Sequence, residues 1–284
     1  MSAACLLYLM RPRQWYKNLV VFLPIFFVGA LFDVVKIQLV IQAFVALCLM
    51  SSCNYIINDI IDIKRDRAHP EKKNRPLAKG LVSVQASVVL AIVLGVCALF
   101  LANSLALEVF YLVLGMFVLT SLYSAWFKRV LFADILLIAT NFVIRAVAGA
   151  YAIAVVASPW LVFCTFLLAL FLVVGKRHSD ALLLKGKASK HKELLKFYTP
   201  DITSALLILS TTAFVMGYSL YSFSRTNMLL ITIPFALYVV FRYFYFIYTG
   251  NEIARHPEMI VKDTPIIIGI ILWVVVTLVV LYVA

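Results

Sequence analysis

The sequence predicts an all-α, polytopic membrane protein, and three observations support this fold class. Of the 284 residues, 64% are hydrophobic and only 13% are charged, which is about half the charged fraction of a soluble domain. Apolar runs of about 20 residues, the length that an α-helix needs to cross a bilayer, recur along the whole chain. Polar residues gather between these runs. We expect one integral-membrane domain over residues 1–284, with nine transmembrane helices and a polar cap that faces the cytoplasm.

Nine spans are predicted in chain order. The first apolar run is flanked by Arg11, Arg13 and Lys17 and is long enough to cross a membrane, so it is interpreted as a helix and not as a secretory signal. A short turn near Asn103–Ser104 predicts a hairpin of two helices. The expected spans are residues 18–35, 38–57, 83–103, 106–125, 131–154, 158–175, 202–222, 228–249 and 264–284.

The basic residues predict the orientation of these spans. Alternate connections hold 21 of the 25 Lys and Arg residues, whereas the opposite side holds only Lys36 and Arg225. By the positive-inside rule, the amino terminus and the long polar loops face the cytoplasm, and nine spans place the carboxyl terminus outside. The protein is therefore expected in the cytoplasmic (inner or plasma) membrane, with its basic face near anionic headgroups and phosphorylated ligands. Nucleic acid is not an expected partner, because no nucleic-acid-binding motif is present.

Residues 54–80 form the one charge-dense stretch in the first half of the chain. If the helix of the second span continues past Asn58, then Asn58, Asp59, Asp62 and Asp66 fall within an arc of about 100°. Oxygen ligands grouped at a helix end suit Mg²⁺, which also keeps waters and binds phosphate oxygens. The alternative is a solvated helix end with acids paired to nearby bases, but like charges on one face repel without a cation. We predict Asp59, Asp62 and Asp66 as ligands of Mg²⁺, with Mn²⁺ as a substitute.

Basic residues follow these acids in the sequence. Arg65 lies near the edge of the acidic face, and Arg67, His69 and Arg75 come after it. Acids for a metal followed by bases for a phosphate is the order expected of a site for a magnesium diphosphate. The other histidines, including His178, lack metal-ligand spacing and are expected to be solvated.

The pattern Asn58-Asp59-x-x-Asp62-x-x-x-Asp66 resembles the first aspartate-rich motif of the UbiA prenyltransferase superfamily. The segment from Tyr123 to Lys128-Arg129 resembles the Tyr and Lys-Arg segment that follows the fourth span in that superfamily. The resemblance implies a UbiA-like bundle of nine helices whose polar loops lie on the cytoplasmic side.

The chain departs from the aromatic prenyltransferases of this superfamily after the sixth span. A second aspartate-rich motif is expected there, but the sequence reads Gly175-Lys-Arg-His-Ser-Asp180, with one acid and two bases. This form is similar to the decaprenyl-phosphate phosphoribosyltransferase branch. The same branch resembles the chain in RPRQWYKN (11–18), DRAHPEKKNRPLAKG (66–80), Asp134 with NFVIRAVAGAYA (141–152), and FRYFYFIYTGNEIARHPEMIVKD (241–263).

The branch implies a reaction in which 5-phosphoribose moves from phosphoribosyl pyrophosphate to a polyprenyl phosphate, for the synthesis of arabinose donors of cell-wall polymers. Asp59 and Asp62 would act through Mg²⁺ on the leaving pyrophosphate. Asp180 is the candidate for stabilising the oxocarbenium character that builds at ribose C1. The acceptor is already an anion, so no strong general base is required. The further residues expected to bind substrate are Lys17, Asn58, Arg65, Arg67, His69, Arg75, Tyr123, Lys128, Arg129, Lys176 and Arg177.

Two arginines fall inside predicted spans. Arg145 follows Asn141 on one helix face, and an ionisable residue within a span is a functional candidate. It could bind the lipid phosphate or form a structural pair with Asp134 or a backbone carbonyl. Arg242 lies among aromatic residues (FRYFYF) that could cover its side chain, so the sequence allows either a structural or a functional role.

Two other functions compete with this hypothesis. A prenyltransferase that moves a prenyl group from prenyl diphosphate to an aromatic acceptor would keep the fold, but the single acid of the third motif argues against it. A polyprenyl-phosphate carrier has no need of a metal for a leaving group, so the acidic residues argue against that function. The sequence is compatible with an oligomer, and the motif spacing selects no lipid chain length.

Overall fold

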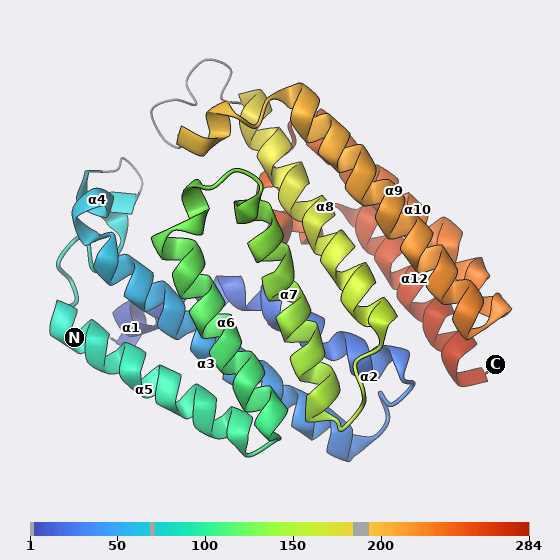
Figure 1. Cartoon of the computed structure of the whole chain (residues 1–284), viewed down its shortest axis with the longest axis horizontal. Coiled ribbons are helices and arrows are strands. Elements are labelled where there is room, and N and C mark those ends of the chain that lie inside the picture. The colour runs from blue at the N-terminus through green and yellow to red at the C-terminus, as the bar shows by residue number, and fades with distance from the viewer. Residues whose placement is uncertain (1–2, 69–71, 184–192, 284) are drawn as a thin grey trace. The chain divides into compact units, whose positions relative to one another are not determined.

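The computed structural model describes residues 3–68, 72–183 and 193–283, and every regular element within these residues is a helix (Figure 1). Eight helices in this part of the chain are long and apolar enough to cross a membrane. They correspond to the second to ninth predicted spans, with ends that differ by at most four residues except in one helix. The sixth span is predicted to end at residue 175, but its helix continues to Leu183 and so includes the Lys176–Asp180 motif. The all-α, membrane-spanning fold class is therefore confirmed.

The chain contacts divide the molecule into two compact units. The first unit consists of residues 1–25, 30–125 and 144–157, and the second consists of residues 26–29, 126–143 and 158–284. Each unit has its own cluster of buried apolar side chains. The expectation of a single domain over the whole chain stays a prediction.

Helix α3 is central to the first unit and packs against α1, η1, α5 and α6. It begins after Asp33, whose side chain accepts a hydrogen bond from the Lys36 amide at 3.1 Å and so caps the helix. Its small and apolar side chains, such as Ala43, Ala46 and Leu47, are fully buried. The helices of this unit are α1 (Ala3–Met10), η1 (Pro12–Phe22), α3 (Val34–Ile61), α4 (Ile63–Arg67), η2 (Lys72–Asn74), α5 (Val84–Asn103) and α6 (Leu107–Ala125), and α2 (Leu23–Phe27) begins in it.

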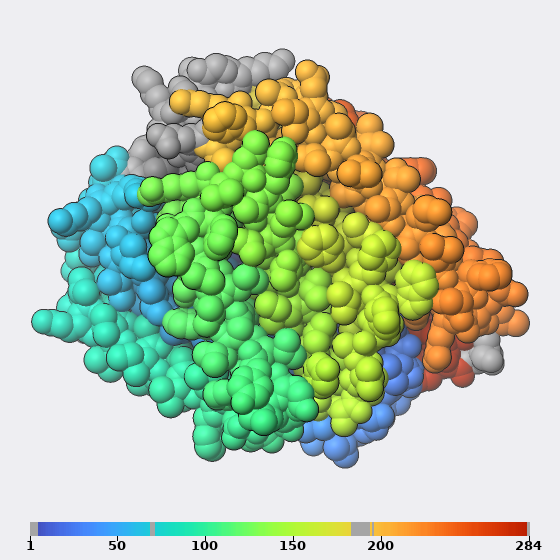
Figure 2. Space-filling model, viewed as in Figure 1, coloured from blue at the N-terminus to red at the C-terminus, as the bar shows by residue number. Residues whose placement is uncertain are grey.

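Helix α8 has the corresponding place in the second unit, where it packs against α9, α10 and α11. On the face seen in Figure 2, the side chains of α8 and α9 lie next to each other. The helices of this unit are η3 (Phe127–Arg129), α8 (Pro159–Leu183), η5 (Glu193–Lys196), α9 (Pro200–Arg225), η6 (Asn227–Thr232), α10 (Ile233–Tyr248), α11 (Glu252–Arg255), η7 (Pro257–Lys262) and α12 (Thr264–Val283). Helix α7 (Ala133–Ala152) contributes its first half to this unit and its second half to the first.

Helix α5 exposes a face of large apolar side chains, among them Val89, Ile92, Val96 and Phe100. A contiguous apolar face of this kind is unfavourable in water but is the normal surface of a helix in lipid. This exposed face agrees with the hydropathy of the chain and supports the assignment to a membrane.

The first predicted span differs from a continuous α-helix. The structure forms a 3₁₀-helix of 11 residues, η1, followed by the five-residue helix α2. Pro24 lacks the amide hydrogen that an α-helix would use, and Gly29 ends the segment at φ +76°. A 3₁₀-helix rises about 2.0 Å per residue against about 1.5 Å in an α-helix, so the summed rise of the two pieces is about 30 Å. Eight helical spans are thus present in the described chain, one of which begins as the 3₁₀-helix η6. A ninth crossing through η1 and α2 stays a prediction.

Candidate functional site

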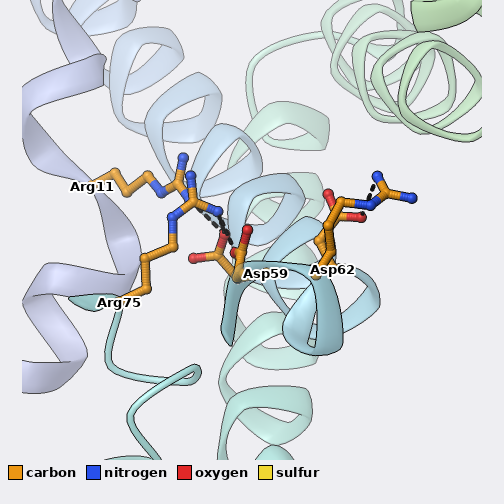
Figure 3. Close-up of polar contacts among 6 residues, drawn as sticks. Arg11, Asp59, Asp62 and Arg75 are labelled. Carbon is orange, nitrogen blue, oxygen red and sulfur yellow. Dashed lines mark hydrogen bonds and ion pairs between the residues drawn. The ribbon is translucent and has the colours of Figure 1, made fainter. Parts of the chain in front are cut away.

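The candidate site of the first unit is a cluster of two carboxylates and two guanidinium groups. Asp59, on the last turn of α3, is only 3% exposed, and its Oδ1 lies 2.5 Å from Arg11 Nη2 and 2.8 Å from Arg75 Nη1. The same Arg75 nitrogen lies 2.6 Å from Oδ2 of the buried Asp66. Figure 3 shows Arg11 and Arg75 converging on Asp59. One positively charged nitrogen therefore bridges two carboxylates that are seven residues apart.

The backbone explains why Asp59 and Asp66 meet. Helix α3 ends at Ile61 and α4 begins at Ile63, so Asp62 lies at a short break. Hydrogen bonds from the Asp62 amide to the Asn58 carbonyl (2.9 Å) and from the Asp66 amide to the Asp62 carbonyl (2.8 Å) keep the helical pitch through the break. Two turns of helix then place Asp59 and Asp66 on one face. This part of the sequence-based geometry is correct.

Asp62 does not join these two carboxylates. Its Oδ1 lies 3.3 Å from Arg65 Nη1, in a more exposed i,i+3 ion pair, and Figure 3 shows its side chain apart from that of Asp59. Within the described residues, no three His, Cys, Asp or Glu side chains gather as they would around a metal ion. The remaining pair, Asp59 and Asp66, does fit Mg²⁺, because this ion is commonly held by one or two carboxylates together with waters and substrate phosphates.

Arg11 is a site residue that the sequence analysis missed, because it was considered only as a flank of the first span. It stands between α1 and η1 with a left-handed backbone, at φ 51°. Its guanidinium forms an ion pair with Asp59 and also lies 5.0 Å from the centre of the Tyr55 ring. The available signal was its position at the start of RPRQWYKN, a stretch that resembles the phosphoribosyltransferase branch.

Arg145 lies in a buried polar layer between α7 and η1. Its Nε donates a hydrogen bond to Asn18 Oδ1 at 2.7 Å, and Asn18 Nδ2 donates to Cys48 Sγ at 3.2 Å. Asn18 is a partner that the sequence analysis did not consider. A Cβ atom at Gly149 would lie 2.0 Å from the Val21 carbonyl oxygen, so α7 and η1 approach each other at backbone distance here.

The second unit contains a separate cluster around Asp134, at the start of α7. This carboxylate is fully buried, accepts a hydrogen bond from Arg177 Nη2 at 2.8 Å, and also accepts one from the Tyr198 hydroxyl. The Phe132 amide donates to the Tyr198 oxygen at 3.2 Å. Burial, together with the hydrogen bond to Asp134, raises the pKa of Tyr198 well above its ordinary value, so the hydroxyl stays protonated and donates.

The third motif lies at the end of α8 and directs its side chains to different neighbours. Asp180 is 6% exposed, and its Oδ1 accepts a hydrogen bond from Arg255 Nε on α11 at 3.0 Å. His178 is buried, with Nδ1 2.8 Å from Thr203 Oγ1 on α9. The prediction that His178 is solvated is therefore wrong, because α9 covers this side of α8.

The structure places the other predicted residues of the first unit as follows. Arg67 donates from Nε to the Ala78 carbonyl at 3.2 Å, so it helps to hold the segment that follows the acidic residues. Lys17, on η1, has its ammonium group 5.9 Å from the centre of the Tyr16 ring. Asn58 and Tyr123 are half-buried on α3 and α6. His69 lies outside the described residues.

In the second unit, Lys176 is exposed on α8, four residues before Asp180 and on the same helical face. Lys128 and Arg129 form the end of the short helix η3, where Arg129 is exposed. Arg242 forms a bidentate ion pair with Asp263, in which Nε lies 2.7 Å from Oδ1 and Nη2 lies 2.8 Å from Oδ2. The Arg242 guanidinium holds the pKa of Asp263 below its ordinary value.

Comparison with known proteins adds sequence relatives and a matching fold. The chain is 34% identical over 220 residues to the decaprenyl-phosphate phosphoribosyltransferase of Mycolicibacterium smegmatis, which covers 76% of this chain and 69% of that protein. It is 32% identical over 225 residues to the protein of the same name from Corynebacterium glutamicum, covering 77% and 67%. The structure of a UbiA homologue from Archaeoglobus fulgidus bound to DMAPP and Mg²⁺ has the same fold, with a TM-score of 0.66, 18% identity and coverage of 98% and 99%.

The family follows from the extent of these matches. The sequence model of the UbiA prenyltransferase family matches residues 19–255 of this chain, from η1 to the end of α11. This range contains the Asp59–Arg75 cluster, the Asp134–Arg177 pair and the third motif. The chain therefore belongs to the UbiA prenyltransferase family.

Proposed function

We propose that this protein transfers 5-phosphoribose from phosphoribosyl pyrophosphate to a polyprenyl phosphate and releases pyrophosphate. The observation that carries the proposal is the composition of the two clusters. The first unit offers two carboxylates with two guanidinium groups, and the second unit offers Lys176 and Arg177 where a second carboxylate-rich motif would stand in an aromatic prenyltransferase. Two substrates that together carry three phosphorylated groups need cations more than additional acids. Relatives named decaprenyl-phosphate phosphoribosyltransferase support the same choice.

The proposed reaction exchanges one bond at ribose C1. The bond between C1 and the pyrophosphate oxygen breaks, and its electron pair leaves with the pyrophosphate. An oxygen of the polyprenyl phosphate forms the new bond to C1. No proton has to move, since the acceptor oxygen is already ionised, and so the protein supplies position and charge stabilisation.

The residues of the first unit would bind the diphosphate. Asp59 and Asp66 would hold Mg²⁺, with Asp62 as a further proposed ligand after it exchanges its contact with Arg65. The bound metal would neutralise the charge that grows on the leaving pyrophosphate. Arg11 and Arg75 already stand beside the carboxylates and carry the planar donor groups that match phosphate oxygens.

The residues of the second unit would act at the sugar and at the other phosphates. One oxygen of Asp180 contacts Arg255, and the carboxylate would stabilise positive charge at C1. Arg177 is oriented by Asp134 and, with Lys176, Lys128 and Arg129, would bind phosphate groups. Arg145 is fixed on Asn18 and would shape the first unit beneath the acidic cluster, a role that its burial favours over direct phosphate binding.

The proposed location is the cytoplasmic membrane, with the amino terminus and both clusters on the cytoplasmic side. The asymmetry of the Lys and Arg residues supports this orientation. A ninth crossing formed by η1 and α2 is part of the proposal, and the products would serve as precursors of cell-wall arabinose donors.

The test is a reaction with defined substrates. Purified protein in lipid nanodiscs, given phosphoribosyl pyrophosphate, Mg²⁺ and polyprenyl phosphate, should release pyrophosphate and form a lipid whose mass equals that of polyprenyl-phosphoryl-5-phosphoribose. Removal of divalent metal with EDTA should stop the release, and Mn²⁺ should restore it in part. Asp59→Asn should reduce turnover by roughly 100-fold or more, as expected when charge stabilisation of a leaving group is lost.

Two outcomes would replace the proposal. Turnover of a prenyl diphosphate with an aromatic acid, without any release of pyrophosphate from phosphoribosyl pyrophosphate, would favour an aromatic prenyltransferase. Transport of polyprenyl phosphate that survives both Asp59→Asn and Asp62→Asn would favour a carrier.

A further inference from the structure

Helix α11 holds Arg255 in a defined place in the second unit. Gly250, at φ +68°, ends α10 in a left-handed conformation that suits glycine. Asn251 then caps α11, because its Oδ1 accepts a hydrogen bond from the Ile253 amide at 3.0 Å. Ile253 and Ala254 are buried, and α11 packs against α8. The backbone that carries Arg255 is therefore fixed by a cap and by packing.

The guanidinium of Arg255 is anchored by one nitrogen. Its Nε donates to Asp180 Oδ1 at 3.0 Å, and the side chain of Arg255 is 40% exposed whereas that of Asp180 is 8% exposed. Among the described residues, the two terminal nitrogens of Arg255 make no hydrogen bond or ion pair. A buried carboxylate thus orients the arginine, while the end of the guanidinium that carries four N–H donors stays open.

Arg242, in the same unit, shows a different arrangement. It contacts Asp263 through both Nε and Nη2, at 2.7 and 2.8 Å. Asp263 also accepts a hydrogen bond from the Ile266 amide at 2.9 Å, so the pair fixes the start of α12. Because the fork of Arg242 is occupied by its carboxylate, its role is structural. Arg255 contacts its carboxylate through Nε alone, so its terminal nitrogens are placed to bind a ligand.

The charges around Arg255 indicate the sign of that ligand. Lys176 and Asp180 share one face of α8, and Arg177 follows Lys176 with its Nη2 on Asp134. Asp134 accepts a hydrogen bond from Arg177 and Asp180 accepts one from Arg255. The end of α8 therefore carries Arg177 and the exposed Lys176 close in sequence to the carboxylate that anchors Arg255 of α11. An anion with several oxygen acceptors suits this set of donors, and a phosphate matches the planar fork of arginine.

We propose that Arg255 is a substrate-binding residue that holds a phosphomonoester dianion, with Asp180 as the positioning residue that aims its terminal nitrogens. The inference rests on the proposed function, in which the first unit binds the diphosphate. Two phosphomonoesters then remain to be bound, the 5-phosphate of the ribose donor and the phosphate of the lipid acceptor. Both have the same chemistry, and the experiment separates them.

The experiment measures KM for each substrate in turn, at saturating concentration of the other. Arg255→Gln, which keeps the length of the side chain, should raise KM for one phosphorylated substrate by roughly tenfold or more, the size expected from the loss of a charged hydrogen bond. A rise for phosphoribosyl pyrophosphate assigns the 5-phosphate, and a rise for polyprenyl phosphate assigns the acceptor. Arg255→Lys should recover only part of the affinity, because lysine lacks both the fork and the Nε that binds Asp180.

A second readout does not depend on turnover. Phosphoribosyl pyrophosphate or polyprenyl phosphate, whichever is assigned to Arg255, should raise the Tm of the wild-type protein more than that of Arg255→Gln. Arg242→Gln is the matched control, because it should lower Tm in the absence of substrate and leave both KM values unchanged.

The possible failures can be told apart. A wild-type protein that forms no phosphoribosyl lipid contradicts the proposed function itself. An active wild-type protein together with an Arg255→Gln variant that keeps both KM values overturns the role of Arg255 alone. Equal changes of KM in the Arg255→Gln and Arg242→Gln variants would also overturn it, since both effects would then be structural.

Discussion

At the scale of single residues, four buried carboxylates near helix ends are bound to arginines. Asp59 and Asp66 share Arg75, whereas Asp134 and Asp180 are bound to Arg177 and Arg255. A carboxylate that is taken out of water is unfavourable unless a charge and hydrogen bonds compensate it. The acids could be predicted as functional from their spacing, but spacing does not show their partners. Arg75 follows η2 within the same charged stretch as Asp59 and Asp66, whereas Arg177 and Arg255 come from helices 43 and 75 residues away from their acids.

Removal of Arg75 tests this dependence. Arg75→Ala leaves Asp59 with Arg11 but takes away the cation that contacts Asp66, so we expect a loss of about 1–3 kcal/mol in the free energy of unfolding and a large fall in kcat/KM for phosphoribosyl pyrophosphate. Denaturant titration in micelles and the pyrophosphate assay measure the two effects. Arg65→Ala is the control: its exposed pair with Asp62 should contribute within about 0.5 kcal/mol. Equal losses of stability in the two variants would contradict the bridging role of Arg75.

Tyr198 offers a second test at this scale. Tyr198→Phe removes only the hydroxyl that donates to the buried Asp134. We expect the free energy of unfolding to fall by about 1–3 kcal/mol, because the buried carboxylate loses one of its hydrogen-bond donors. The same denaturant titration measures it. Tyr111→Phe, on α6, changes a hydroxyl of a side chain that is 60% exposed and should be close to neutral. A neutral Tyr198→Phe would show that Arg177 alone compensates the charge of Asp134.

At the scale of elements, η1 is the unusual part of the molecule. A 3₁₀-helix of 11 residues is longer than most, since its hydrogen bonds are poorer than those of an α-helix. Tertiary contacts hold it in place: Trp15 Nε1 donates to Ser52 Oγ at 3.1 Å, and Asn18 links Cys48 and Arg145. Arg11, at its start, reaches Asp59. Thus η1 connects the buried polar layer to the acidic cluster.

Gly149 tests the packing of this element. Gly149→Ala would place a Cβ atom 2.0 Å from the Val21 carbonyl oxygen, and η1 would have to move. We expect a loss of about 1–3 kcal/mol, the usual cost of overpacking, together with reduced turnover. Gly115→Ala on α6 is a matched control in another membrane-spanning helix, because its Cβ would meet no atom within 4 Å. It should be neutral or stabilising by up to about 1 kcal/mol, from helix propensity. Similar results for both glycines would contradict the close approach.

At the scale of the whole molecule, the distribution of charge against the eight apolar helices predicts how the chain is inserted. Most basic residues lie in alternate connections, including the stretch between α3 and α5, whereas the turn between α5 and α6 has none. This asymmetry is a property of the whole chain, because each connection alone carries a weak signal.

Cysteine labelling measures the orientation. In a variant without the five native cysteines, Ser104→Cys lies in the exposed turn between α5 and α6 and should react with a membrane-impermeant maleimide in intact cells. Lys73→Cys, in the exposed helix η2, should react only after the membrane is permeabilised. The reverse pattern would invert the proposed orientation and place the acidic cluster outside.

The sequence by itself determined the fold class, the positions of eight of the nine predicted spans and the position of the main acidic motif, because length, hydropathy and helical spacing are local properties of the chain. Local spacing also placed Asp59 and Asp66 on one face. Spacing could not separate Asp62 from them, since that depends on the break at Asp62 and on its contact with Arg65.

Only the tertiary structure decided which arginine meets which acid. Arg11 and Asp59 are 48 residues apart, and Arg255 and Asp180 are 75 apart, so no local pattern connects them. It also decided that the first predicted span begins within the 3₁₀-helix η1. The buried contacts of Asn18 and Arg145 and the close approach at Gly149 stabilise this conformation, which local propensity disfavours. The sequence showed which residues could carry the chemistry. The long-range pairing of arginines with carboxylates, by contrast, arises from the packing of segments that are distant in sequence.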